Sequence, residues 1–287
     1  MTAQSELYDR VAQQTASLVI REYSTSFSLA TTFLGAGVRQ DVENIYGLVR
    51  VADEIVDGVA MQAGLEREAV RRELDEFERE TEVAMQTGYS TNLIIHAFAL
   101  TARRCNIEID LTRPFFASMR ADVTESTHDA DSFDAYVYGS AEVVGLMCLQ
   151  AFLRELPTSA EEHARFVRGA RALGAAFQKV NFLRDLSADF DHLGRSYFPG
   201  VDLEKLTDAD KDRLVADIDL DLALSRSIVP DLPRSSRRAV ALAESLFASL
   251  NKRIAKTPAQ KLRSTRVSVP TLTKFWLALT AWFGKVS

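Results

Sequence analysis

Cysteine, glycine and proline are scarce in this chain of 287 residues, which holds two, 13 and seven of them. Cys105 and Cys148 form no metal or redox spacing, so neither a disulfide framework nor a thiolate metal site is expected, and two isolated thiols fit a reducing compartment. No glycine-rich phosphate loop and no dinucleotide fingerprint is present. The four histidines share no ligand spacing, which argues against a zinc site.

The chain also lacks a basic balance and a long apolar run. Its net charge of −6 argues against a general nucleic-acid binder. No stretch approaches the roughly 18 consecutive apolar residues of a membrane span, so no transmembrane helix is predicted. The first residues, MTAQSELYDR, are too polar and acidic for a signal peptide, and a cytoplasmic location is expected.

Helical periodicity dominates what is present, and no segment alternates convincingly with period two. Residues 65–86 are heavily charged, as in an outer helix, and Pro114 is expected near the start of its helix. We expect one helix ending near Gly58 and others at about 5–22, 65–86, 92–105, 113–124, 131–153, 159–190, 207–227, 235–255 and 271–284. One all-α domain over residues 1–287 is the economical architecture.

The stretch QKVNFLRDLSAD, residues 178–189, carries a polar stripe among apolar residues. Its members are spaced i, i+3, i+7 and i+11 and are Gln178, Asn181, Asp185 and Asp189. A helix places such residues on one face, which apolar neighbours would direct into the protein interior. Because buried carboxylates are costly unless they are paired or bound to metal, this stripe needs a cation.

A second stripe of this kind lies in YGLVRVADEIVD, residues 46–57. Its members are Tyr46, Arg50, Asp53 and Asp57. Two such helices opposed across a cavity would form an oxygen-rich cage. Mg²⁺ suits the cage because it prefers one or two carboxylates, several waters and substrate phosphates. Arg50 and Arg184 beside the aspartates suit the same ligand, since guanidinium groups bind phosphate oxygens in bidentate geometry.

Simpler interpretations of these stripes stay open. Aspartates at i, i+4 are frequent on solvated helices and at helix ends. Arg50 could form an ordinary ion pair with Asp53, one turn further on. Arg184 directly precedes Asp185 on the predicted helix, so these two side chains are expected to diverge. The two pairs together, both set among apolar residues, favour the cage.

At these residues the sequence resembles the squalene/phytoene synthase family, the head-to-head trans-prenyl transferases, and most of all its bacterial phytoene-forming members. The segments that carry the resemblance are YSTSFSLA at 23–30, IYGLVRVADEIVD at 45–57, YVYGSAEVVGLM at 136–147, NFLRDLSAD at 181–189 and GRSYFP at 194–199. The resemblance implies a single-domain isoprenoid-synthase-type helical bundle around a central cavity. It also implies dependence on Mg²⁺, for which Mn²⁺ could substitute. No use of NADPH is expected, because two C20 chains give phytoene without a reductant.

The resemblance further assigns roles by position. The expected metal ligands are Asp53, Asp57, Asn181, Asp185 and Asp189. The same four aspartates and Tyr136 are expected to be catalytic. The expected substrate-binding residues are Ser24, Ser26, Phe27, Tyr46, Arg50, Gln178, Arg184, Tyr197 and Arg266. The sequence departs from the family pattern at Glu142, where glycine is common, and at Phe247, where tyrosine is frequent.

The implied reaction joins two prenyl diphosphates through a cyclopropylcarbinyl diphosphate. Four small residues would leave length for a C20 tail: Ala30, Thr31, Ala141 and Gly145. We therefore predict condensation of two geranylgeranyl diphosphates to phytoene, as in carotenoid biosynthesis. The alternative is condensation of C15 farnesyl diphosphate to dehydrosqualene or squalene. A lesser alternative is a non-catalytic assembly or scaffold protein with the same fold.

The segment FWLALTAWF, residues 275–283, is too short to span a bilayer and has two interpretations. It forms a terminal core helix, or it brings Trp276 and Trp282 to a membrane surface as a peripheral contact at the inner face of the membrane. The expected partners are prenyl diphosphates and no nucleic acid. The sequence carries no signal for an oligomeric state.

Overall fold

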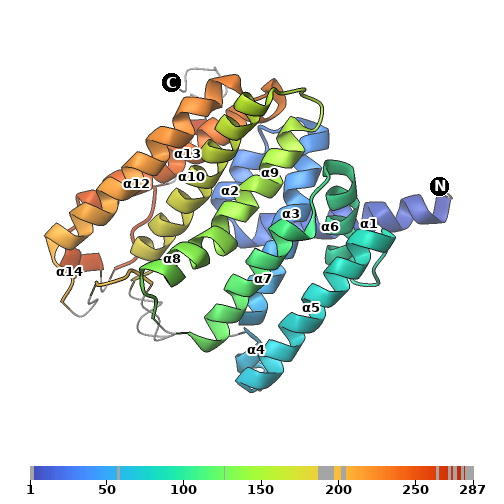
Figure 1. Cartoon of the computed structure of the whole chain (residues 1–287), viewed down its shortest axis with the longest axis horizontal. Coiled ribbons are helices and arrows are strands. Elements are labelled where there is room, and N and C mark those ends of the chain that lie inside the picture. Colours follow the sequence, from blue (N-terminus) through green and yellow to red (C-terminus); the bar gives the residue numbers. More distant parts are fainter. Residues whose placement is uncertain are drawn as a thin grey trace.

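The computed structural model describes residues 3–56, 59–125, 127–186, 197–201, 205–262, 265–270, 273, 277–278 and 281. Over these residues the regular secondary structure is helical and no β-strand forms, as the periodicity predicts (Figure 1). The helices are α1 (Ala3–Tyr23), α2 (Thr25–Thr31), α3 (Ala36–Val56), α4 (Val59–Gln62), α5 (Arg67–Thr87), α6 (Leu93–Cys105), α7 (Ile109–Thr124), α8 (Ala130–Val137), η1 (Tyr138–Glu142), α9 (Val143–Leu153), α10 (Ala160–Arg184), α12 (Asp208–Ile228), η3 (Val229–Asp231), α13 (Arg234–Ala255) and α14 (Ala259–Leu262).

Two apolar cores support the helices that carry the polar stripes. One core lies among α3, α5, α6, α7 and α9, and the other lies mainly among α10, α12 and α13. Figure 1 shows α10, α12 and α13 side by side, while α5 and α6 lie in the other half of the bundle. Helices α3 and α10 both pack on α9, which therefore lies between them. The chain thus places its two polar stripes on opposite sides of one space.

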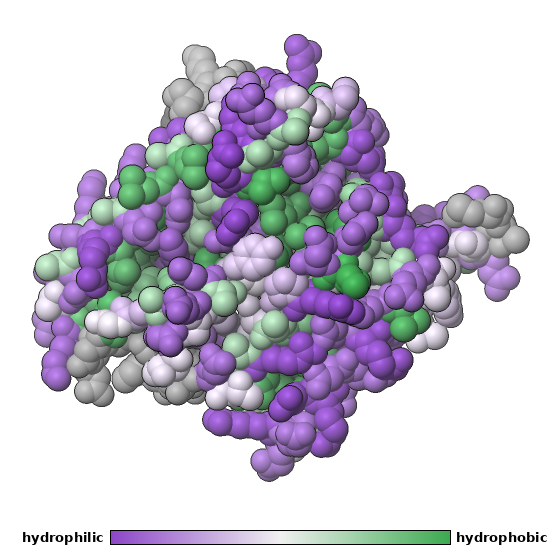
Figure 2. Space-filling view, viewed as in Figure 1, coloured by the Kyte–Doolittle hydropathy of each residue, from purple (hydrophilic) through white to green (hydrophobic). Residues whose placement is uncertain are grey.

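Helix α5 is the outer helix that its charges predict. Its buried residues form a single stripe and are Val70, Leu74, Phe77, Thr81 and Ala84. The rest of the helix is largely exposed, and Figure 2 shows mostly hydrophilic residues over this side of the molecule. The stripe is spaced as expected for a helix that buries one face against α3, α6 and α7.

Helix α7 begins earlier than predicted. It starts at Ile109, not near residue 113, so Pro114 lies inside the helix as its sixth residue. Proline has no N–H to donate, and its ring crowds the carbonyl four residues before it. That carbonyl belongs to Asp110 in the first turn of α7, where the disturbance affects only the end of the helix.

The helix predicted over residues 131–153 is continuous, but its middle turn is π-helical. Residues 138–142 form this wider turn, η1, between α8 and α9. A Cβ atom on Gly139 would lie 2.2 Å from both the carbonyl oxygen of Pro114 and Oγ of Ser118, so only glycine fits there. The π turn is thus pressed backbone to backbone against α7.

Glycine also sets the contact between this helix and α10. A Cβ on Gly145 would lie 2.6 Å from the carbonyl oxygen of Ala170, and one on Gly174 would lie 2.5 Å from that of Ala141. Gly145 therefore permits close packing of the two helices, and it also lines the cavity described below.

By length and hydropathy, one helix among the described residues could cross a membrane: Ala130–Leu153, with 56% of its most apolar window buried. It packs on α7 and α10 and lines the central cavity, so its apolar residues serve the core. In the terminal segment, Leu277, Ala278 and Ala281 pack against Leu242 and Leu246 of α13. Trp276 and Trp282 lie outside the described residues, so membrane contact stays a prediction.

Replacing Gly174 with alanine should destabilise the fold by about 1–3 kcal/mol, because the new methyl group would overlap the backbone of η1. Urea unfolding followed by circular dichroism measures the change. Gly37→Ala is the matched control, since its Cβ would meet nothing closer than Arg154, at 3.9 Å, and alanine favours a helix. Equal unfolding midpoints for the two variants would contradict a backbone contact between α10 and η1.

Candidate functional site

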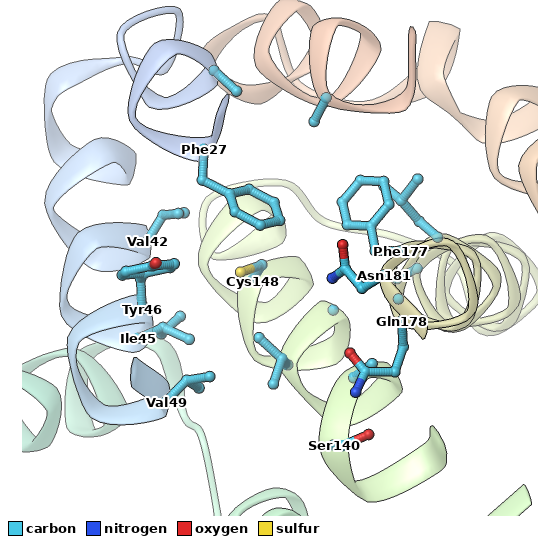
Figure 3. A pocket seen from close by; sticks show the side chains of 18 of the residues that line it. Phe27, Val42, Ile45, Tyr46, Val49, Ser140, Cys148, Phe177, Gln178 and Asn181 are labelled. Carbon is cyan, nitrogen blue, oxygen red and sulfur yellow. The ribbon is translucent and has the colours of Figure 1, made fainter. Parts of the chain in front are cut away.

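A cavity of about 450 Å³ lies between α3 and α10, with α9 behind it (Figure 3). Figure 3 shows Tyr46 and Val49 of α3 on one side and Gln178 and Asn181 of α10 on the other. The charged and amide residues that line it are Arg50, Asp53, Asp122, Gln178, Asn181, Arg184 and Asp185. Most of the remaining lining is apolar, including Val144, Leu149, Phe152 and Leu173.

Both polar stripes reach this cavity within the described residues. Asp53 comes from α3, and Asp185 comes from the end of α10. The other aspartate of each predicted pair, Asp57 and Asp189, lies outside the described residues. The described part of the site is therefore one carboxylate from each stripe, each accompanied by arginine.

On α3, Arg50 is held between two carboxylates. Its guanidinium donates to Asp53 Oδ2 at 2.6 Å and also to Glu54, which the sequence analysis did not single out. The ordinary ion pair left open for Arg50 therefore exists in this structure. Burial raises the pKa of Tyr46, one turn before Arg50, although the arginine charge and a hydrogen bond with Ser24 oppose that rise.

At the end of α10, the expectation that Arg184 and Asp185 diverge is wrong. Nε of Arg184 donates to both oxygens of Asp185 at 3.0 Å, and Arg266 donates to Asp185 Oδ1 at 2.7 Å. The helix ends at Arg184, six residues earlier than predicted, and Asp185 is its C-cap with φ −102° and ψ 12°. Because the backbone leaves the helix here, neighbouring side chains can meet, and two guanidinium groups neutralise one carboxylate.

Asn181 offers an oxygen that the protein leaves unused. Its Oδ1 is buried and accepts no hydrogen bond from the residues that the structure describes, and Figure 3 shows the side chain at the cavity. Asp185 remains one turn away, since its N–H donates to the carbonyl of Asn181 at 2.9 Å. Amide and carboxylate oxygens are the donors that Mg²⁺ prefers, so Asn181, Asp185 and Asp53 fit that ion.

Protein ligands alone do not complete such a site in the described part of the chain, where no three His, Cys, Asp or Glu side chains gather around one point. Mg²⁺ commonly keeps several waters and takes phosphate oxygens from its substrate, so few protein ligands suffice. The donors in the described part of the chain therefore suit an ion that completes its shell with water and with oxygens from a ligand.

Of the three predicted substrate-binding residues at the start of α2, only one lines the cavity. Ser24 is the N-cap of α2, accepting the N–H of Phe27 at 3.2 Å, and neither Ser24 nor Ser26 lines the cavity. Phe27 does line it, with its ring 5.7 Å from that of Phe177 (Figure 3). Phe177 stacks in turn on Phe247 at 3.8 Å, so the phenylalanine that replaces the family's tyrosine packs ring to ring in the core.

Tyr136 and Tyr197 meet at a carboxylate that the sequence analysis missed. The hydroxyl of Tyr136 donates to Asp122 at 2.8 Å, and that of Tyr197 lies 3.4 Å from the same residue. Asp122 is 8% exposed and lies on α7. The available signal was its spacing, because Phe115, Met119 and Asp122 fall at i, i+4 and i+7 and place an acid on an apolar stripe.

The electrostatics of this cluster keep Tyr136 protonated. Burial raises the pKa of the Tyr136 hydroxyl well above its usual value, and the charge of Asp122 raises it further. A tyrosine with a raised pKa remains a hydrogen-bond donor at neutral pH. Tyr136 therefore donates to Asp122 and does not act as a phenolate.

Glu142, the other departure from the family pattern, has a partner on the outer side of the site. It pairs with Arg171 of α10 at 2.5 Å, and the guanidinium of Arg171 lies 5.1 Å from the ring centre of Tyr138. Neither Glu142 nor Arg171 lines the cavity. The glutamate thus links η1 to α10 without entering the site.

The fold is shared with solved isoprenoid-forming enzymes. The chain matches a dehydrosqualene synthase crystallised with a ligand, with a TM-score of 0.77 and 21% identity over 96% of this chain and 97% of that one. It also matches a squalene synthase from Alicyclobacillus acidocaldarius, with a TM-score of 0.73 and 21% identity over 88% of this chain and 97% of that one. At this identity the likeness establishes a common all-helical fold.

The sequence comparison defines the family more closely. The squalene/phytoene synthase family model matches residues 20–273, and the chain belongs to this family. It is 32% identical to phytoene synthase 3 of Zea mays over 195 residues, 67% of this chain and 44% of the maize protein. It is 29% identical to the phytoene synthase of Arthrospira platensis over 223 residues, 75% of this chain and 68% of that protein. The match thus spans less than half of the maize protein.

Both thiols should be nearly unreactive in the folded protein. Burial raises the pKa of Cys105 to about 11 and that of Cys148, which lines the cavity, to about 12. Because the thiolate is the nucleophile, about one Cys105 in a thousand is ionised at pH 8, three units below its pKa. Ellman's reagent should therefore react slowly at pH 8, faster as the pH rises, and rapidly in guanidinium chloride. Rapid labelling of the native protein at pH 8 would contradict these environments.

Proposed function

We propose that the protein is a Mg²⁺-dependent prenyltransferase that condenses two molecules of geranylgeranyl diphosphate head to head to phytoene. The observation that carries the proposal is that Asp53 and Asp185, each with arginine, line one largely apolar cavity. A charged end suits a diphosphate, and apolar walls suit a prenyl tail. Family membership and the phytoene synthase relatives at about 30% identity support the same activity.

The diphosphate would be bound by the guanidinium groups of Arg50, Arg184 and Arg266, which match phosphate oxygens in bidentate geometry. Asp53, Asn181 and Asp185 would hold Mg²⁺, and Asp57 and Asp189 are proposed as further ligands. When bound, the ion would supply positive charge to the diphosphate leaving group. To bind phosphate, the three arginines must exchange part of their carboxylate contacts for phosphate contacts.

The cavity walls would control the cations that follow. Loss of diphosphate from one substrate leaves an allylic cation, which the double bond of the second substrate attacks to form, with loss of a proton, a cyclopropylcarbinyl diphosphate. Phe27, Tyr46 and Phe177 supply ring faces that attract a cation without bonding to it. The apolar lining keeps water from capturing the cation. Ionisation of the intermediate, rearrangement and loss of a second proton give the hydrocarbon.

The choice of a C20 substrate rests on small residues along the cavity. The cavity is lined by Ala30 and Thr31 of α2 and by Ala141 and Gly145 of the η1–α9 helix. A longer tail gains roughly 0.8 kcal/mol for each CH₂ that it buries, so a C15 chain would forfeit several kcal/mol in a cavity shaped for C20. The chain-length preference is therefore a property of these walls and independent of the charged end.

Asp53→Asn and Asp185→Asn should each lower turnover by about 10²–10³-fold or more, because each removes charge that holds the ion at the leaving group. EDTA should abolish turnover, and added Mg²⁺ should restore it. Asp212→Asn is the matched control, since this exposed aspartate of α12 lies outside the cavity. Circular dichroism checks folding. Full turnover by a folded variant of either cavity aspartate would remove the proposed cage.

Incubation with Mg²⁺ and geranylgeranyl diphosphate, without NADPH, should give a C40 hydrocarbon identified by mass. Thr31→Phe should shift the preference toward farnesyl diphosphate, because a ring at this buried position shortens the tail region. Thr32→Phe, at the exposed neighbouring position, is the control and should leave the product unchanged. If the wild-type protein forms only C30 products, the C20 assignment is wrong, while the proposed condensation still stands.

A further inference from the structure

Asp122 brings together side chains from separate parts of the chain at the cavity wall. It lies on α7, while Tyr136 comes from α8 and Tyr197 follows α10 in the chain. Both oxygens of Asp122 accept the Tyr136 hydroxyl, at 2.8 and 2.9 Å, and the Tyr197 hydroxyl lies 3.4 Å from Oδ1. All three residues line the cavity, so the contact forms part of the wall that a substrate would meet.

The rings attached to these hydroxyls form one cluster. Tyr197 stacks on Phe182 of α10, with ring centres 4.0 Å apart and an interplanar angle of 11°. Tyr136 lies 5.3 Å from Tyr197 and 6.0 Å from Phe182. His128 stacks behind Tyr197 at 5.9 Å, and its side chain is 4% exposed. Packing therefore restricts the planes of the rings, and hydrogen bonding to Asp122 restricts their hydroxyls.

Burying the Asp122 carboxylate beside an apolar cavity costs free energy unless its hydrogen bonds compensate for the lost hydration. A leucine would fill the same apolar stripe beside Phe115 and Met119 without the penalty. The position is better explained by what the carboxylate does to its donors. A phenol that donates to a carboxylate is held in one orientation, and its oxygen and ring gain electron density, which strengthens attraction for a cation.

We infer that Asp122 is a positioning residue for the proposed reaction, holding the hydroxyls of Tyr136 and Tyr197 at the cavity wall while the substrate reacts. The inference rests on the proposed prenyl transfer and adds a role for a residue on α7. Without the charge of this acceptor its hydrogen bonds weaken, and the hydroxyls can turn into the cavity and admit water. The allylic cation would then form a C–O bond with water, lose a proton and leave as an alcohol, at the expense of the hydrocarbon.

The test is a double-mutant cycle of Asp122→Asn and Tyr136→Phe. Asn keeps the shape of Asp122 but removes its charge. Asp122→Asn should lower kcat by about 10–100-fold, change KM by less than about threefold and raise the alcohol fraction. Tyr136→Phe removes the hydroxyl that donates to this carboxylate, so the charge of Asp122 has less left to act on and the double variant should be little slower than the slower single variant. Asp110→Asn, at an exposed position on α7, should behave as wild type.

Several outcomes would overturn the inference. These are additive losses of kcat, a change in KM alone, or an Asp122→Asn variant with wild-type kcat and products. If Asp122→Asn does not fold, Tyr197→Phe tests the same cluster, and wild-type kcat and products from that variant would also count against it. If the wild-type protein forms no product at all, the proposed function fails. The same variants are then compared by their free energies of unfolding in urea. Additive losses from the two substitutions would show that Asp122 does not hold Tyr136.

Discussion

The cost of keeping carboxylates charged beside an apolar cavity governs the structure around this site. An unpaired carboxylate in such surroundings would take up a proton or draw in water, so each needs positive charge or hydrogen-bond donors. Asp53 pairs with Arg50, and Asp185 pairs with Arg184 and Arg266. Asp122 accepts hydrogen bonds from tyrosine hydroxyls. Arg266, Tyr136 and Tyr197 come from other segments than the carboxylates that they contact, so Asp185 and Asp122 gain these partners only when the bundle is assembled.

Much of the fold and part of the site could be predicted because both depend on local period. A repeat near 3.6 residues put Gln178, Asn181 and Asp185 on one face, and these residues do share one cavity. The same logic identified α5 as an outer helix from its charges. That α3 and α10 face each other could also be anticipated. Each helix has a polar face that needs a cation, and two opposed faces can share one cation.

What the sequence could not predict depends on contacts between distant segments. The end of α10 at Arg184 lets Arg184 and Asp185 pair, although the unbroken helical pattern predicted divergence. The π turn follows from Gly139 being pressed against α7, which no local pattern reveals. The spacing of Asp122 places an acid on an apolar stripe, but only the structure shows its partners, the hydroxyls of Tyr136 and Tyr197.

The two charged sides of the cavity are not equivalent among the described residues. On α3, one guanidinium faces two carboxylates, those of Asp53 and Glu54, while at the end of α10 two guanidinium groups face the single carboxylate of Asp185. The first side therefore has negative charge to offer a cation, and the second has positive charge to offer an anion. A diphosphate that arrives with its metal carries both signs. The described residues therefore offer such a ligand charges of both signs, with net negative charge on α3 and net positive charge at the end of α10.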